Sequence, residues 1–420
     1  MPNQTKVPLW FSTPLLAILF FHMMCESMVI PILAPTLAEP TSPHCDMLAG
    51  FSDQMHKLSY GIALAVYPVL VFIFAPIIGA ISDNIGRRPI LIIALIGTII
   101  GCLAQGVAME IMSLWIFIIG RALVGATAGV DGVIQAALLD KCNTQTQKDY
   151  YLGASLFAMS IGFMAGPAFA ALLINEKATT FAWSLPFLSL VPIFALTLLA
   201  LWKKIDAKKD SEKTNLKNVN WLSGITDIAI LFKIKPARKM LWIFVLAEIG
   251  AGCFTALIPL KLGESFDFSV KEIAYFISLH GVFSSVVFGF IGPQMLKRFS
   301  KNFILRFSMF MCIIACAMPY FDELENLIWL DTFAMAMGYA LSYYILLSIM
   351  ADSASEKKRG WLLSVLSSLW GLTMGIGLVL CGIIVGISND FGILICTILS
   401  LSAFLFSLER IKHFKLKDDI

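Results

Sequence analysis

The stretch Gly79-Ala-Ile-Ser-Asp83-Asn-Ile-Gly86-Arg87-Arg88-Pro89 decides the fold, because it lies between two long apolar runs, 58–82 and 89–107. Each run is long enough to cross a bilayer, since about 20 apolar residues span roughly 30 Å. The polar stretch is therefore predicted to be a very short loop between two membrane helices. It combines an acid, a helix-breaking glycine and a pair of arginines.

The same kind of apolar run recurs along the whole chain. Hydrophobic residues make up 58% of the 420 residues and charged residues only 14%, against about 25% charged in soluble domains. Because lipid offers a bare backbone no hydrogen bonds, the spans must be helices. Twelve spans are predicted, at 8–37, 58–82, 89–107, 111–139, 151–175, 181–202, 240–260, 273–296, 303–321, 327–351, 360–387 and 391–408.

One polar segment divides these spans. Residues 203–239 hold ten Lys or Arg residues and four acids, with six predicted spans on either side. We therefore expect an all-α integral membrane protein with twelve transmembrane helices in two pseudo-symmetric six-helix bundles around a central cavity. The first bundle is 1–202, the linker 203–239 is cytoplasmic, and the second bundle is 240–420 with a short cytoplasmic tail.

The distribution of basic residues predicts the orientation. With the N-terminus in the cytoplasm, all but five of the 31 Lys and Arg residues fall on the cytoplasmic side. Such an asymmetry places both termini inside. The net charge of +3 comes with no basic-aromatic stripe, so no nucleic-acid partner is expected. The nine cysteines contain no C-x-x-C pair, and neither a metal nor a cofactor is expected.

The short loop also resembles a known signature. Its pattern G-x-x-x-D-x-x-G-R-R is similar to the loop between helices 2 and 3 of major facilitator superfamily transporters. The resemblance implies a conformational latch that holds the outward-open state, with its acids and bases at cytoplasmic helix ends. Asn84 stands where the family often has arginine, and the copy of the loop at 294–301 keeps the basic charge but loses the aspartate and glycine. The latch residues are Gly79, Asp83, Gly86, Arg87, Arg88 and Asp140.

Two further motifs support the same family. Arg121 and Gly125 form an R-x-x-x-G pattern that resembles the family's motif for proton-coupled transporters, although Val124 replaces the usual glutamine. The pattern Gly153-x8-Gly162-x3-Gly166-Pro167 resembles the antiporter motif, with alanines at its last two glycine positions. Small residues there would let spans 5 and 8 approach closely. Ordinary small-residue packing is the alternative explanation.

Several ionisable residues lie within the predicted spans. Burial in lipid is costly for such groups, so each is expected to face the interior. The candidates for proton coupling are Glu26, Arg121, Asp131 and Glu248. We expect Glu26 to be the principal acid, with Arg121 as its electrostatic partner. A structural role for Asp131 is an equally good interpretation, and His280 is interpreted as an interior histidine.

The predicted function is secondary active transport of a small molecule by alternating access, as proton-coupled drug or metabolite export by antiport. The alternative is a proton-coupled or facilitative carrier of a nutrient, amino acid or siderophore. There is no nucleotide-binding loop of the G-x-x-x-x-G-K-[ST] type and no catalytic motif, so an enzyme is not expected. The expected partners are the substrate, protons and the lipid bilayer, and the expected form is a monomer in the bacterial inner membrane.

The predicted orientation can be tested with thiol labelling. An impermeant thiol reagent added from outside should label Cys45, which falls in a predicted external loop, but not a cysteine introduced at Lys209 in the linker. Labelling of intact cells followed by mass spectrometry measures both sites. The reverse pattern would contradict the assignment of the termini to the cytoplasm.

Overall fold

The computed structural model describes residues 7–39, 46–174, 181–202, 223–321, 327–353 and 356–409. Within these ranges the secondary structure is helical and contains no strand. Twelve helical segments are long and apolar enough to cross a membrane, which confirms the predicted number of spans. The predicted all-α membrane fold is therefore confirmed.

The first six spans use eight α-helices and one π-helix. The first span is broken into α1, α2 and the π-helix η1, and the fourth is broken into α5 and α6. The bounds are α1 Leu9–Ser27, α2 Val29–Leu33, η1 Ala34–Ala38, α3 Asp53–Ile85, α4 Arg87–Glu110, α5 Leu114–Thr127, α6 Val130–Asp140, α7 Gln145–Leu173 and α8 Phe181–Trp202.

The second six spans follow a short additional helix, α9. Two of them, the eighth and the tenth, also contain π-helical turns. The bounds are α9 Ser223–Lys233, α10 Lys235–Phe266, α11 Val270–Val286, η3 Val287–Ile291, α12 Gly292–Arg298, α13 Lys301–Ala317, η4 Met318–Tyr320, α14 Ile328–Met335, η6 Ala336–Ala340, α15 Leu341–Ser353, α16 Glu356–Val385 and α17 Asn389–Leu408.

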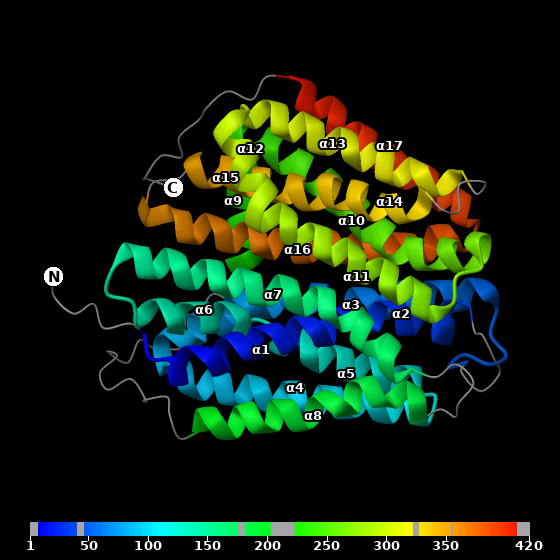
Figure 1. Ribbon diagram of the computed structural model, residues 1–420, viewed down its shortest axis with the longest axis horizontal. Helices are drawn as coiled ribbons and strands as arrows, with labels where there is room; N and C mark the ends of the chain where they lie inside the picture. The colour runs from blue at the N-terminus through cyan, green and yellow to red at the C-terminus, as the bar shows by residue number, and fades with distance from the viewer. Residues whose placement is uncertain are drawn as a thin grey trace.

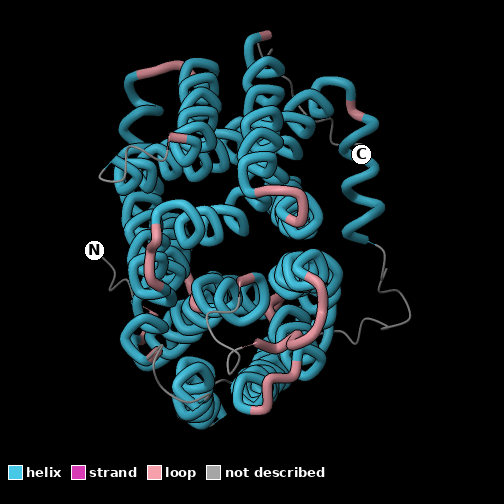
Figure 2. Tube along the Cα trace, turned by 90° about the vertical axis from the view of Figure 1, so that its right-hand side faces the viewer, coloured by secondary structure: helices cyan, strands magenta, loops and turns pink. Residues whose placement is uncertain are grey.

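The long helices lie side by side in two groups, α1–α8 below and α10–α17 above in Figure 1. In that view α1 begins and α17 ends toward the left, and we call this side of the bundle the terminal end. The opposite side, which faces the viewer in Figure 2, is the far end. Part of the predicted linker, 203–222, lies outside the described residues, and the remainder contains α9 and the start of α10 at Lys235.

The junction between α3 and α4 is a single residue. Gly86 has a φ of 97°, which an L side chain rarely adopts, and it ends α3 while α4 begins at Arg87. Its backbone N–H donates to the carbonyl of Ser82. Both flanking helices therefore extend into the stretch that was predicted to be a loop, and only Gly86 lies between them.

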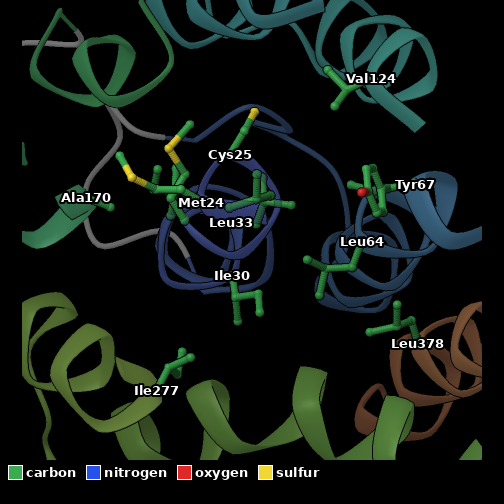
Figure 3. Packing of buried hydrophobic residues seen from close by; sticks show 14 of the residues in the cluster. Met24, Cys25, Ile30, Leu33, Leu64, Tyr67, Val124, Ala170, Ile277 and Leu378 are labelled. Atoms are coloured by element: carbon green, nitrogen blue, oxygen red, sulfur yellow. The ribbon is translucent and has the colours of Figure 1, made fainter. Parts of the chain in front are cut away.

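The two groups of helices are in close contact toward the far end. A Cβ on Gly61 of α3 would lie 2.7 Å from the carbonyl oxygen of Leu378 in α16, so the two backbones nearly touch. The hydroxyl of Tyr60 donates to the carbonyl of Ala256 in α10 at 3.0 Å. Figure 3 shows Ile30 of α2 pointing toward Ile277 of α11 across the same boundary.

The terminal end differs. There α6 and α15, the terminal-end halves of the fourth and tenth spans, pack mainly against helices of their own groups. The short helix α9 contacts both α3 and α16. The structure is therefore closed between the groups at the far end, with less contact between them at the terminal end.

The glycines of the antiporter-like motif face α1, which corrects one expectation. A Cβ on Gly162 would lie 2.1 Å from the carbonyl oxygen of Phe20, and one on Gly166 would lie 2.1 Å from Ser27 Oγ. These residues therefore let spans 1 and 5 approach, not spans 5 and 8. The contact between α7 and α11 instead uses Gly281, whose Cβ would lie 2.8 Å from the Cα of Met164.

This close approach predicts a position-specific effect on stability. Gly162→Ala should destabilise the fold by ~1–3 kcal/mol, because the added methyl group overpacks the contact with α1. Gly153→Ala in the same helix is the matched control, since no atom lies within 4 Å of its Cβ position. Thermal unfolding in detergent measures both variants. Equal unfolding temperatures would contradict the tight contact between α1 and α7.

Candidate functional site

The centre of the first group of helices holds a buried ion pair. Arg121 of α5 is 1% exposed, and its two terminal nitrogens donate to the two carboxylate oxygens of Glu26 in α1, at 2.6 Å and 3.2 Å. This is the two-pronged geometry for which the planar guanidinium is suited. The structure thus brings together the two residues that the sequence analysis paired.

The remaining donors of Arg121 are directed at α3. Its Nε donates to the carbonyl of Ala63 at 3.4 Å, and Nη2 also donates to that of Leu64 at 3.3 Å. The guanidinium carbon lies 5.1 Å from the centre of the Tyr67 ring, within the range of a cation–π interaction. One arginine therefore connects α1, α3 and α5. Breaking such a buried pair by removing one partner typically costs about 3–5 kcal/mol.

Solvent access differs between the two partners. The side chain of Glu26 is 17% exposed, whereas that of Arg121 is 1% exposed. The carboxylate is therefore partly accessible, whereas the guanidinium behind it is not.

A second pair lies beside the first. Nδ1 of His22 lies 3.1 Å from Oδ1 and 3.3 Å from Oδ2 of Asp131, which connects α1 to α6. The exposed fraction is 1% for the histidine side chain and 13% for the aspartate. His22 Nε2 is buried and has no hydrogen-bond partner among the described residues. The sequence analysis placed Asp131 but did not pair it with His22.

The sequence did carry a signal for this second pair. His22 and Glu26 are four residues apart on α1, so they share one face of that helix. Spans 1 and 4 run in opposite directions, and Arg121 precedes Asp131 along the chain. Antiparallel neighbours therefore match His22 with Asp131 once Glu26 is matched with Arg121.

The second group of helices contains ionisable residues of a different kind. Glu248 of α10 is 5% exposed and forms no hydrogen bond or ion pair with the described residues. Asp331 of α14 is fully buried, and neither of its carboxylate oxygens has a partner in the described part of the chain. Asp331 was missed although it lies in a predicted span. His280 is held by the carbonyl of Thr332 at 3.4 Å and Ser284 Oγ at 3.5 Å, as an interior histidine would be.

The latch residues lie at the terminal end. Arg87, the first residue of α4, donates from Nε to Asp140 Oδ2 at 3.3 Å and from Nη1 to Ser82 Oγ at 3.1 Å. Asp140 is the last residue of α6, so this pair ties span 3 to span 4 within one group. The side chain of Asp83 lies outside the described part of the structure.

The second group repeats this ion pair despite its degenerate signature. Lys301, the first residue of α13, donates to Asp352 near the end of α15 and also to Ser348 Oγ at 2.9 Å. Spans 9 and 10 are thus tied together as spans 3 and 4 are. The charges at the helix ends therefore recur in places where the glycine and aspartate of the motif do not.

The described residues contain no group of three or more His, Cys, Asp or Glu side chains arranged to hold a metal ion. Several of their charged side chains form ion pairs between helices. Twelve membrane-crossing helices in two six-span groups, with interior ionisable residues, are typical of a secondary carrier.

The comparison with protein families identifies the kind of carrier. The family model described as Major Facilitator Superfamily matches residues 15–360 and, in a second match, 249–417. The chain belongs to the Major Facilitator Superfamily.

The proteins that are similar to this chain in sequence include resistance proteins. The chain is 25% identical over 363 residues to the class D tetracycline resistance protein of Salmonella ordonez, covering 85% of each chain. It is 24% identical to the class B protein of Escherichia coli, covering 91% of this chain and 89% of that one. The quinolone resistance protein NorA of Staphylococcus aureus is 20% identical over 71% of this chain and 74% of its own.

Solved structures show the same fold at lower sequence identity. The human organic anion transporter MFSD10 (TETRAN) gives a TM-score of 0.67 at 17% identity, covering 97% of this chain and 100% of that one. A D-xylose-proton symporter gives 0.73 at 13% identity, covering 96% and 98%.

The repeated ion pair at the terminal end predicts a functional symmetry. Asp352→Asn should slow transport about as much as Asp140→Asn, because each removes the charge that ties two neighbouring spans together. An exposed pair contributes up to ~1 kcal/mol, so protein abundance should hardly change. The same energy shifts a balance between two conformations by up to about fivefold.

Glu409→Gln is the matched control for this prediction. Glu409 pairs with Lys239 at 2.8 Å, also at the terminal end of the second group, but outside the repeated pair. Flux in vesicles, corrected for protein amount, measures the three variants. Normal flux in Asp352→Asn beside impaired flux in Asp140→Asn would show that only the first pair matters.

Proposed function

We propose that this protein is a proton-coupled exporter that moves a drug-like or metabolite-sized molecule out of the cell by antiport. The observation that carries the proposal is the ion pair between Arg121 and a partly exposed Glu26. Three resistance proteins among the relatives have names consistent with export. The antiporter-like spacing from Gly153 to Pro167 supports the same direction of transport.

The cell membrane is the proposed location, with both termini in the cytoplasm. The basic residues of the loops support this orientation under the positive-inside rule. The terminal end then faces the cytoplasm and the far end faces outward. A structure closed at its far end corresponds to the inward-facing step of the cycle.

Glu26 is the proposed proton carrier. As a carboxylate it holds the fork of Arg121, whereas a protonated Glu26 has no negative charge to hold it. Arg121 would then keep only its contacts with the carbonyls of Ala63 and Leu64 and with the ring of Tyr67. Each proton gained or lost by Glu26 thus changes how firmly α1 is attached to α3 and α5.

His22 and Asp131 give the proton a route toward the cytoplasm. Asp131 lies nearer the terminal end than Arg121 and has a partly exposed side chain. His22 lies one helical turn from Glu26 and contacts Asp131 through Nδ1, while its Nε2 has no partner among the described residues. A ring with one nitrogen on an acid and the other unpartnered is suited to passing a proton between them.

The coupling role predicts separable effects on uphill and downhill movement. Glu26→Gln retains hydrogen-bonding capacity but cannot ionise, so it should abolish accumulation driven by a pH gradient while leaving downhill exchange measurable. Arg121→Lys should also fail in uphill transport, because lysine lacks the planar fork of donors. A panel of solutes tested in everted vesicles under an imposed pH gradient measures both activities.

Glu110→Gln, at the exposed end of α4, is the control for removing an acid. It should transport normally. If Glu26→Gln still accumulates substrate while Asp131→Asn or Glu248→Gln does not, the coupling role belongs to one of those acids.

A further inference from the structure

Two acids from opposite groups of helices meet at the far end. Glu39 directly follows η1 of the first span, and Glu264 lies in the last turn of α10. A carboxylate oxygen of Glu39 lies 4.0 Å from the position that a Cβ on Gly263, the neighbour of Glu264, would occupy. Glu39 is half-buried, with an intermediate exposed fraction, so its charge is partly removed from water.

Asn389 links these two carboxyl groups. It is the first residue of α17, is only 4% exposed, and donates from Nδ2 to Glu264 Oε2. The same amide lies near enough to Glu39 to lower the pKa of that carboxyl group. One buried amide from the second group thus lies beside an acid of each group.

The oxygen of the same amide has no hydrogen-bond donor beside it. Asn389 Oδ1 is buried and has no hydrogen-bond partner in the described structure. An amide oxygen can only accept, and an ionised carboxylate can only accept as well. A protonated carboxyl group, by contrast, carries an O–H that can donate to Oδ1 or to the second carboxylate. The missing donor is therefore what a proton on Glu39 would supply.

Several other charged residues lie at this place. Lys57 of α3 acts on Glu39. Lys261 of α10 is engaged by Asp390 at 3.0 Å, and Nδ1 of His56 lies 2.9 Å from the carbonyl oxygen of Leu37 and 3.7 Å from Asp46. On the neighbouring α11, Glu272 is held by its own capping residue Ser269, and Lys271 is exposed. Lys57 therefore acts on Glu39, while Lys261 is paired with Asp390.

We propose that Glu39, Glu264 and Asn389 form an external proton-binding site that closes the far end between the two groups of helices. A proton on Glu39 supplies the missing donor and removes the repulsion between Glu39 and the exposed Glu264. Loss of that proton leaves two like charges beside a buried amide oxygen, which drives the groups apart.

The direction of the pKa shift of Glu39 agrees with closure on protonation. Burial raises the pKa of Glu39, the charge of Glu264 raises it further, and Lys57 and the Asn389 hydrogen bond oppose these effects. In the open state the carboxyl group would be in water and have its ordinary pKa. A pKa raised in the closed state means that protonation favours closure. Closure is therefore favoured fully below the ordinary pKa and lost as the pH rises through the raised one.

This site rests on the proposed function only through the orientation and the alternating access of the carrier. The site differs from Glu26 in its position, which is between the two groups of helices, and in its role, which is to close the far end. A proton arriving from outside would help to close the outer face behind it, which is the sense required for inward proton movement.

The test measures opening of the far end directly. Ile30, which is 6% exposed and points across the boundary in Figure 3, is replaced by cysteine in a Cys45→Ser background. An impermeant thiol reagent is added outside right-side-out vesicles at about pH 4.3, the ordinary glutamate pKa, and at about pH 8. Rates are normalised to Met55→Cys, an exposed position of α3, which removes the reagent's own pH dependence.

The normalised rate at Ile30→Cys should rise at least about fivefold from the lower to the higher pH, as expected when a two-state balance shifts. The double substitution Glu39→Gln/Glu264→Gln cannot ionise and should hold the rate low at both pH values, with a ratio below about twofold. The double substitution Glu110→Gln/Asp267→Asn, at exposed acids of the far end, should keep the full ratio.

A pH ratio that is absent in the parent protein, or unchanged in Glu39→Gln/Glu264→Gln, would overturn the proposal. Because the readout is accessibility, it does not depend on knowing the substrate. Failure of the exporter proposal would appear as a loss of gradient-driven flux only, with the labelling ratio intact.

Discussion

The pair between Arg121 and Glu26 is the constraint on which the interior of the first group depends. A guanidinium that is 1% exposed in a membrane protein is tolerable only while its charge is matched. Matching it requires α1, α3 and α5 to stay in one arrangement, since acid, carbonyls and ring come from all three. Any event that changes the charge of Glu26 is therefore felt by three helices at once.

The two groups of helices solve the problem of interior charge differently. In the first group, each interior acid that the sequence analysis singled out, Glu26 and Asp131, has a basic partner. In the second, Glu248 and Asp331 are buried without partners among the described residues. The repeated ion pairs Arg87–Asp140 and Lys301–Asp352 show that the groups nevertheless share one plan at the terminal end. The symmetry is kept at helix ends, where each pair joins a cation at the start of one helix to an anion near the end of another, and it is lost in the interior.

Much of the fold was predictable because membrane crossing leaves a plain record in the sequence. Runs of about 20 apolar residues can only be helices in lipid, so the twelve spans followed from composition and length. The pairing of Glu26 with Arg121 followed from the cost of an isolated charge. The helix that packs against Gly162 and Gly166 could not be predicted in this way. Their spacing shows that one face of the helix carries small residues, but it does not identify the neighbouring helix. The proposed external site was also beyond reach, since Glu39, Glu264 and Asn389 are far apart in the sequence and Glu39 lies beside the other two only where the groups meet.

The one-residue junction at Gly86 has a mechanical consequence for the carrier. With no slack between α3 and α4, the end of α3 cannot move without carrying the start of α4 with it. Away from Gly86 the two helices pack mainly on other partners, α3 on α16 and α5, and α4 on α5 and α8. A displacement imposed where α3 touches α16 is therefore passed through Gly86 to α4, and from α4 to α5 and α8.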